Sequence, residues 1–324
     1  MHAVRAPVAF DGIRFLDGGA TVLVDRDRIV GVEPFGYDLP DGCTLASYDG
    51  TVLPGLINAH RHLSSEGSVG ALERVGAATD EEIDATIAQS QHRQVRAGVT
   101  TVRDLGDRHY RTLVARDRPT AGLPRIVAAG PPVTTPGGHC HYLGGEASGL
   151  DGIEAALEER RERGVDVVKV MASGGMLTMG TDILGVQFSA AELRALVDAA
   201  HQADLTVLAH GHSLAGIEHA LGAGVDGIEH FSGLVENGIR VPDEVLAQTA
   251  AAIGDLVAAG YPMAEALATA TSLAAEACGL AEVTGSLRAG LAADVLVMDG
   301  DLRSGPNPLR SPVHVMVRGV SALP

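Results

Sequence analysis

The chain of 324 residues contains no tryptophan, and aromatic residues make up only 3% of it. So few aromatic side chains argue against a surface that stacks on nucleic-acid bases. A formal net charge of −17 argues against both nucleic acid and anionic membranes. No apolar run approaches the roughly 20 residues that a membrane span needs, and the N-terminal segment lacks the basic-then-apolar pattern of a signal peptide. The sequence therefore predicts a soluble globular protein with neither nucleic acid nor membrane as a partner.

Cysteine is scarce, and its three positions are far apart. Cys43, Cys140 and Cys278 form no CxxC pair and no zinc-knuckle spacing. Such a pattern is typical of a reducing compartment, so we expect a cytoplasmic protein.

Lysine is nearly absent. Lys169 is the sole lysine, the other 23 basic residues are arginine, and Lys169 lies in the apolar segment GVDVVKVMASGG. Arginine keeps its proton in a protein, whereas a buried lysine can lose it and become a neutral nucleophilic amine. Two interpretations are open at this point: a chance lysine whose ammonium group reaches solvent, or a lysine retained for its chemistry.

The two ends of the chain share one pattern. Residues 1–52 and 282–324 both consist of short strand-like runs separated by Gly, Pro and Asp at turn positions. Neither end has enough apolar residues for a core of its own. We expect them to pair into one small composite β-sandwich around a middle domain of residues 53–281.

The middle domain alternates between strand-like and helical segments. The strand-like runs are apolar without polar alternation, which is typical of a parallel sheet covered on both faces; they span 51–62, 98–106, 125–134, 165–173, 205–212 and 225–232. Helical patterns lie between several of them, at 151–163, 190–202 and 213–223. Six such repeats predict an α/β fold, either a (β/α)8 TIM-type barrel or a doubly wound sheet. No GxGxxG follows the first strand, which disfavours a dinucleotide-binding form of the latter.

Histidine, lysine and aspartate residues gather at the carboxyl ends of these strands. In a parallel barrel those ends open on one face, and that face carries catalysis. The residues are His60 and His62, Asp104, His139 and His141, Lys169, His210 and His212, and His230.

The pattern predicts a metal site. In the sequence HRH the side chains of His60 and His62 point to the same side of a strand, and two imidazoles form half of a divalent-metal site. With His210 and His230 at neighbouring strand ends, we expect two divalent ions. Beside them the ammonium form of Lys169 would be disfavoured. The neutral amine could add CO2 and become a carbamate that bridges the two metals.

The sequence resembles the amidohydrolase superfamily, and within it the imidazolonepropionase-related group that includes metal-dependent Xaa-Pro dipeptidases and carboxypeptidase-like enzymes. The resemblance covers nearly the whole chain and is carried by VLPGLINAHRHL, AGVTTVRDLG, GGHCHYLGGE, VKVMASGG, LAHGHS, GIEHFSG and ATATSLAAEACGLAEVTGSLRAGLAADVLVMDGD.

The resemblance implies a role for each of the strand-end residues. His60 and His62 would bind the more buried metal, His210 and His230 the second, and carboxylated Lys169 would bridge them. His139 would contact the scissile carbonyl, and it would also bind substrate with His141, Tyr142 and His212. An exchange of the ligand role between His210 and His212 is left open.

One part of the family pattern is missing. Related enzymes carry an aspartate at the end of the eighth strand, which binds metal and transfers protons. Here the segment after residue 231 passes into helical patterns, and Asp243 and Asp255 both lie in helical contexts. Six strands cannot close a barrel that needs eight. Either the protein is an inactive relative, or the sequence lacks an internal segment near residues 248–252; we favour the second.

These observations predict a metal-dependent amidohydrolase. It would cleave a C–N bond of a dipeptide, N-acyl amino acid or similar small amide by a metal-activated hydroxide, with two divalent ions, Zn²⁺ in the first place. Two alternatives stay open: a cyclic-amide hydrolase of the imidazolonepropionase type, and a non-catalytic pseudoenzyme that lacks the strand-eight aspartate. The family resemblance also implies a homo-oligomer. The sequence does not identify the substrate.

Overall fold

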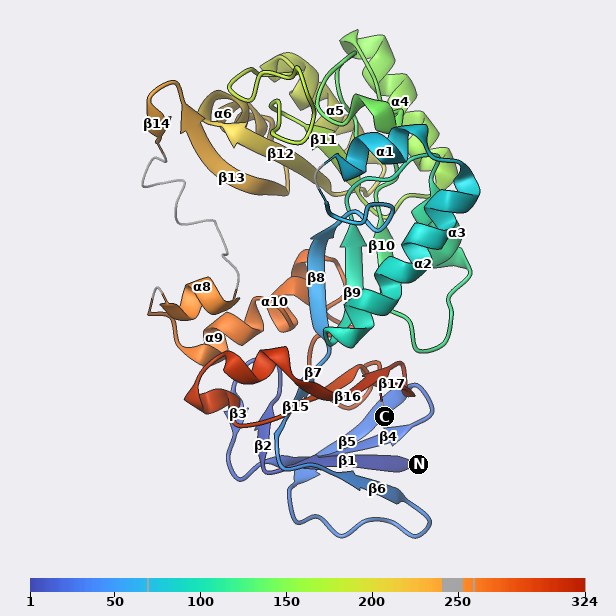
Figure 1. Ribbon diagram of the computed structural model, residues 1–324, viewed down its shortest axis with the longest axis vertical. Coiled ribbons are helices and arrows are strands. Elements are labelled where there is room, and N and C mark those ends of the chain that lie inside the picture. The colour runs from blue at the N-terminus through green and yellow to red at the C-terminus, as the bar shows by residue number, and fades with distance from the viewer. Residues whose placement is uncertain (69, 241–252, 259, 324) are drawn as a thin grey trace.

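The computed structural model describes residues 1–68, 70–240, 253–258 and 260–323. Figure 1 shows strands from both ends of the chain at the bottom, three parallel strands in the centre, and a second group of strands with its helices at the top. Among the described residues, no helix has the length and apolar character needed to span a membrane. All three cysteines are free thiols.

Strands from both ends of the chain form two neighbouring sheets. The first has the order β5-β4-β1-β6 and the second β17-β16-β15-β7-β2-β3. In the second sheet β7 pairs with β15 in antiparallel register, Thr51 opposite Met298, which joins the two ends of the chain. Both sheets contribute to one apolar core, for example through Val22 and Val295. The strands are β1 (His2–Ala6), β2 (Val8–Phe10), β3 (Phe15–Leu16), β4 (Ala20–Asp25), β5 (Arg28–Pro34), β6 (Thr44–Ser47), β7 (Thr51–Pro54), β15 (Val295–Met298), β16 (Pro312–Val317) and β17 (Val320–Leu323).

The middle of the chain contains six parallel strands, one in each of the predicted strand-like runs. They form two groups, β10-β9-β8 and β11-β12-β13, and the second is extended by a short antiparallel strand. The loop after β10 connects the groups: Val133 donates a backbone hydrogen bond to the Lys169 carbonyl (2.7 Å) and accepts one from Met171 (2.9 Å). The strands are β8 (Leu56–Arg61), β9 (Val99–Asp104), β10 (Arg125–Ala128), β11 (Val168–Met171), β12 (Val207–Ser213), β13 (Gly227–Val235) and β14 (Gly238–Ile239).

Helices follow the parallel strands, and several begin at sequence-encoded caps. Thr79 with Glu82, and Ser189 with Glu192, form reciprocal capping boxes at the starts of α2 and α5. The three predicted helices are present as α4 (Gly149–Arg163), α5 (Ala190–Gln202) and α6 (Leu214–Ala223). The others are α1 (Ala71–Ala77), α2 (Asp80–Arg96), α3 (Arg111–Asp117), α8 (Ile253–Ala258), α9 (Met263–Ala268) and α10 (Ser272–Ala277), with short 3₁₀ turns η1 (His141–Leu143), η2 (Leu302–Ser304) and η3 (Asn307–Arg310).

The main core lies between the second strand group and helices α4, α5 and α6. Ile153, Val170, Phe188, Leu196 and Ala209 all pack in this cluster and are 2% exposed or less. Burial of a large apolar side chain contributes roughly 1.5–3 kcal/mol to stability. This core therefore holds β11 and β12, which carry Lys169 and two of the histidines, in a fixed position.

Within the described residues the ring of parallel strands is open. β13 pairs with β12 and β14, and β8 pairs with β9. The predicted junction at 248–252, and Asp243, lie outside the described residues. Asp255 lies in α8, in agreement with its predicted helical context.

Candidate metal centre

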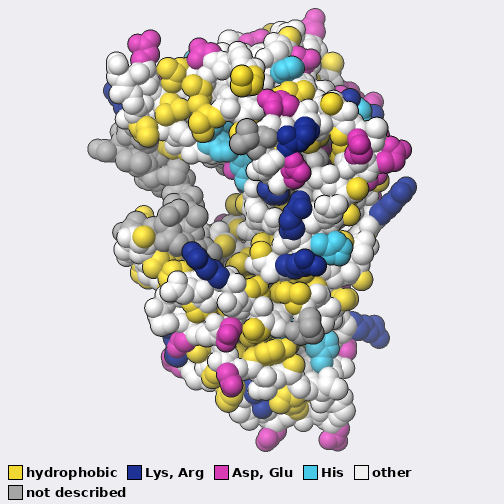
Figure 2. Space-filling view, viewed as in Figure 1, with side chains coloured by type: hydrophobic (Ala, Val, Ile, Leu, Met, Phe, Trp, Pro, Cys, Tyr) yellow, Lys and Arg dark blue, Asp and Glu magenta, His cyan; other side chains and the backbone are white. Residues whose placement is uncertain are grey.

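Parallel register brings the polar strand ends together. Met171 lies opposite His210 on β12, and Gly211 lies opposite His230 on β13. The six strands run in the same direction, so their carboxyl ends meet at one edge of the sheet. Figure 2 shows histidine side chains beside the hollow in this face of the molecule.

The backbone at His230 has an uncommon conformation. His230 and Phe231 both have positive φ values, 70° and 47°. A residue other than glycine pays about 1–3 kcal/mol for such a conformation, which proteins retain mainly at functional sites. The local distortion is a sign that the position of the His230 ring matters more than regular strand geometry.

Six histidine rings form a chain of contacts around one cavity of about 470 Å³. The ring centroids of His60 and His230 are 4.9 Å apart, and those of His210 and His230 are 4.7 Å apart. His62 lies 5.5 Å from His60, and His139 lies 4.4 Å from His210. The lining residues are His60, Arg61, His62, Leu72, His139, Cys140, Lys169, Met171, Met176, Leu177, His210, His212 and His230.

Three of these rings are close enough to share one ion. His210, His212 and His230 each offer a nitrogen, and the three nitrogens lie within 4.8 Å of one another. The sequence prediction named His210 and His230 as ligands and placed His212 beside the substrate. The geometry brings His212 as near as His210, so it leaves their possible exchange open.

Hydrogen bonds orient the rings and fix which nitrogen faces the cavity. His62 donates from Nδ1 to the Gly106 carbonyl (2.8 Å), and His60 donates from Nδ1 to Glu229 (2.7 Å). Both therefore keep the Nε2 lone pair for a ligand. His210 donates from Nε2 to the Gly174 carbonyl (3.2 Å), so its free lone pair is on Nδ1. Donation of the other ring N–H to an oxygen is the usual arrangement of a metal-binding histidine.

The electrostatics keep these imidazoles neutral. Burial, helped by the neighbouring His60, lowers the pKa of His62 to about 3. Burial lowers the pKa of His139 to about 4 and that of His210 well below its usual range. His230 is exposed at the edge of β13, but its ring packs against neighbouring rings, and this partial burial together with His60 lowers its pKa. A neutral imidazole is the form that binds a metal ion. These rings are therefore ready to act as ligands at physiological pH.

Lys169 lies at the centre of this arrangement. Its side chain is 1% exposed, and its Nζ is buried without a hydrogen-bond partner among the described residues. Burial lowers its pKa to about 8. The lysine does not reach solvent, so the interpretation of a chance lysine with a solvated head is wrong.

A glycine-rich loop covers His139. Gly175 approaches the His139 ring so closely that an added Cβ would lie 2.4 Å from it. Tyr142, predicted to bind substrate, hydrogen-bonds the Leu177 carbonyl (3.2 Å) and Thr178 (3.0 Å) in the same loop. His141 and Tyr142 do not lie among the described residues that line the cavity, so their contact with substrate stays a prediction.

A model of the amidohydrolase family matches residues 51–254. The chain belongs to the amidohydrolase family. It is similar to ochratoxinase from Aspergillus niger, 27% identical over 241 residues, which cover 65% of this chain and 50% of that protein. It is also similar to an uncharacterized protein of Mycobacterium tuberculosis, 30% identical over 255 residues, 74% of this chain and 59% of that protein. The chain thus spans about half the length of the curated relatives it matches.

Solved structures agree on the fold of this amidohydrolase. A Xaa-Pro dipeptidase with bound methionine superposes with a TM-score of 0.84 at 22% identity, covering 99% of both chains. The A. niger ochratoxinase superposes with a TM-score of 0.80 at 21% identity, and the match covers 98% of this chain and 94% of that one. A putative prolidase from Bifidobacterium longum superposes with a TM-score of 0.77 at 26% identity, and the match covers 99% of this chain and 94% of that one. The predicted α/β fold of the amidohydrolase type is confirmed.

Two residues of the site were missed by sequence reasoning. Glu229 accepts the hydrogen bond from His60 and forms an ion pair with Arg103 (3.3 Å). Burial alone would raise the pKa of Glu229, but the His60 hydrogen bond and the nearby Lys169 lower it to about 2. Arg103 also donates to the carbonyls of Ala59 and Ala277. A signal was present, since Glu229 directly precedes His230 at a strand end.

The donor set of this amidohydrolase fits a divalent metal. Neutral imidazoles with free lone pairs suit Zn²⁺ and similar ions, and the buried amine of Lys169 has no described partner to satisfy it. The strand-eight aspartate implied by the family has no counterpart among the described residues that line the cavity. The histidine cluster is thus compatible with a metal centre.

Proposed function

We propose that this chain is the metal-binding part of a hydrolase that cleaves the C–N bond of a dipeptide, an N-acyl amino acid or a similar small amide. The observation that carries the proposal is the cavity in which neutral histidines and one buried lysine meet at the ends of parallel strands. The similarity to proteins named ochratoxinase and Xaa-Pro dipeptidase supports this reaction class.

We propose that His60, His62, His210 and His230 hold two divalent ions, with Zn²⁺ favoured by the imidazole-rich donor set. Bound there, such ions would polarise the amide carbonyl and make water a stronger nucleophile at neutral pH. Glu229 supports this set, because its carboxylate holds the Nδ1–H of His60 and so directs Nε2 to the cavity.

Lys169 acts in this proposal as its carbamate. The neutral Nζ adds to CO2, a C–N bond forms, and one proton is released to solvent. The product would be an anionic oxygen donor for the metal ions. The Lys169 amine is buried without a described partner and has a pKa of about 8, and both properties support this role. Arginine could not take it, because a guanidinium keeps its proton.

His139 is the residue we assign to the substrate carbonyl. Its pKa of about 4 keeps the ring neutral, so it would act as a hydrogen-bond donor and not as an acid. A neutral donor stabilises negative charge on the carbonyl oxygen without a change of protonation state. The loop around Gly175 holds the ring in place.

We also propose that two further βα units complete a (β/α)8 barrel in the full-length protein. The exposed side of β13, where His230 is exposed, supports a missing neighbour. The eighth strand would supply the aspartate that passes a proton to the leaving amine. The mass of the protein expressed from its gene tests this: the 324-residue chain has a mass of 33.3 kDa, so a gene product several kilodaltons heavier would support the completed barrel, and one of 33.3 kDa would contradict it. Domain limits at 53 and 281, a cytoplasmic location and homo-oligomeric assembly remain predictions.

Metal analysis is the first test of the function. We expect near two equivalents of divalent metal per chain, and His230→Ala should lose at least one of them. His92→Ala is the matched control, because His92 is an exposed histidine on α2. If His230→Ala bound as much metal as the control, the ligand assignment would be wrong.

Turnover is the second test. The full-length protein should release free amine from a panel of Xaa-Pro dipeptides and N-acyl amino acids, and a chelator should abolish the release. Metal binding without turnover on any of these amides would refute the hydrolase and leave a metal-binding protein.

A further inference from the structure

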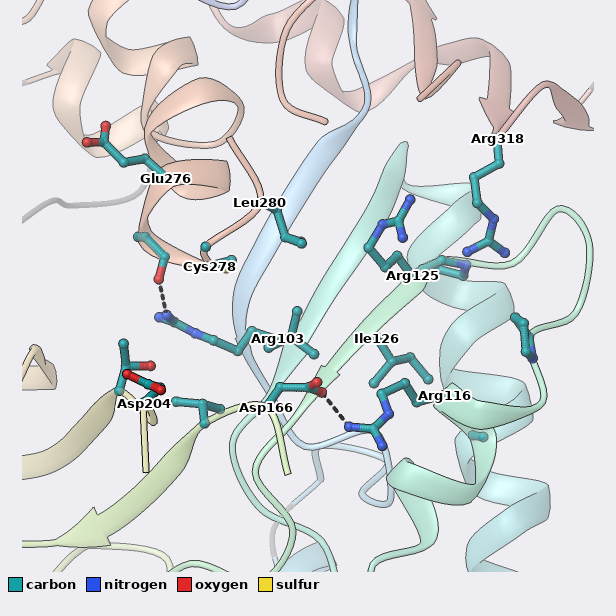
Figure 3. A pocket seen from close by; sticks show the side chains of 18 residues that line it. Arg103, Arg116, Arg125, Ile126, Asp166, Asp204, Glu276, Cys278, Leu280 and Arg318 are labelled. Carbon is teal, nitrogen blue, oxygen red and sulfur yellow. Dashed lines mark hydrogen bonds and ion pairs between the residues drawn. The ribbon is translucent and has the colours of Figure 1, made fainter. Parts of the chain in front are cut away.

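A second cavity lies at the opposite ends of the parallel strands from the histidines. It has a volume of about 640 Å³ and is shown in Figure 3. Arg125, the first residue of β10, and Arg318, in the turn between β16 and β17, lie on one side of it, and Asp204 and Glu276 lie on the other side. The walls between them include apolar side chains such as Ile126. The cavity therefore has one cationic side and one acidic side.

The arginines of this cavity differ in their partners. Arg116 pairs with Asp166 (2.9 Å), and Arg103 pairs with Glu229. The Arg125 side chain makes no hydrogen bond and no ion pair with any residue that the structure describes, and its Nε is buried without a partner. A buried donor without a partner costs about 1–3 kcal/mol, and more when it is charged. The Nε–H of Arg125 is thus a buried donor without a partner among the described residues, and Asp294 attracts the guanidinium without a hydrogen bond.

Arg318 adds a second cation beside it. Its backbone N–H donates to Asp294 (2.8 Å), and its guanidinium makes only long contacts, 3.4 and 3.3 Å, to the carbonyls of Thr120 and Leu123. Asp294 is the nearby carboxylate, and its oxygens accept hydrogen bonds from the Arg318 backbone N–H and the Thr284 hydroxyl (2.8 Å), not from either guanidinium. Two guanidinium groups and one carboxylate leave a net positive charge at this end of the cavity.

We infer that Arg125 and Arg318 form a binding site for the oxyanion head of a small organic acid, a carboxylate or a phosphate. A guanidinium binds both groups through paired N–H donors. The cavity has the size of a small-molecule site, and its apolar walls suit a short hydrophobic body. Asp204 and Glu276 on the other side repel the head and so orient the ligand. Arg125 belongs to the parallel strands and Arg318 to the C-terminal strands, so the ligand joins the two parts of the molecule.

Calorimetric titration of the full chain with inorganic phosphate and with benzoate, at constant ionic strength in sodium chloride, tests the site. We expect saturable binding of at least one probe, and the preferred probe identifies the head group. Arg125→Gln and Arg318→Gln should each weaken it at least tenfold, since each removes charged hydrogen bonds. Arg14→Gln is the charge-matched control, because Arg14 is exposed and lies outside the cavity.

Two outcomes would overturn the inference: no saturable binding of either probe, or equal binding by the control and both cavity variants. Two separate variants guard against a folding defect in one of them. Binding should persist in His230→Ala, because the histidines lie at the other ends of the strands. The result is therefore independent of the proposed hydrolase.

Discussion

Replacement of Lys169 by methionine should stabilise the metal-free protein while it destroys the metal centre. The pKa of Lys169 falls from 10.5 to about 8 because the side chain is buried. At neutral pH both the folded and the unfolded chain carry the proton, and the folded state holds it less favourably. A difference of 2.5 pKa units corresponds to about 3 kcal/mol at 1.36 kcal/mol per unit. Methionine has a similar length and no charge, so Lys169→Met should gain about this amount at pH 7.

The dependence on pH makes the test specific. Between pH 8 and 10.5 the unfolded chain binds more protons than the folded one, so wild-type stability rises with pH through this window. At pH 10 only about 1 kcal/mol of the penalty remains. The advantage of Lys169→Met should therefore shrink by about 2 kcal/mol between pH 7 and pH 10. A common loss of stability at high pH affects both proteins and cancels in the difference.

The assay is urea unfolding of both proteins at the two pH values, in buffer freed of metal by a chelator and of CO2 by degassing. Metal content after reconstitution is measured in parallel, and the variant should bind less than the wild type. An equal or lower stability of Lys169→Met at pH 7, or an advantage independent of pH, would refute the picture of a buried, unpaired amine.

Two further substitutions probe the surroundings of the site. Burial raises the pKa of Asp107 to about 6, so between about pH 4 and 6 the folded state binds more protons and stability falls as pH rises. Asp107→Asn, which keeps an acceptor for the Thr112 N–H (2.6 Å), should reduce this slope and gain up to about 3 kcal/mol at pH 7; buried Asp104, whose pKa is also raised, keeps its own contribution. Urea unfolding at pH 4 and pH 7 measures the slope, and equal slopes in the two proteins would contradict the prediction. Gly175→Ala places a methyl group against the His139 ring and should cost about 1–3 kcal/mol of stability and lower kcat for amide hydrolysis; unchanged kinetics would show that the ring position is unimportant.

Much of the fold followed from the sequence because its signals are local. The helix predicted at 190–202 coincides with α5, since Ser189 and Glu192 encode its start. The histidines of the cavity were predicted because strand ends share one edge in a parallel sheet. Arg103 was missed because its role depends on contacts between distant strands, which no local pattern encodes. Glu229 was missed although its position directly before His230 at a strand end was a local signal. The hydrogen bond between the Tyr142 hydroxyl and Thr178 was not predicted, because it depends on how that loop folds; the predicted contact of Tyr142 with substrate stays a prediction.

The pairing of Thr51 with Met298 also has a consequence during synthesis. The two residues are 247 positions apart in the chain, and at 5–20 residues per second the ribosome needs roughly 12–50 s to make what lies between them. Throughout that time β7, which already pairs with β2 on one side, waits with its other backbone edge unpaired, while the α/β layer can already collapse on its own core. Such edges invite association with other nascent chains. The strands that carry the histidine cavity can thus assemble early, whereas the sheet in which β7 pairs with β15 is completed last.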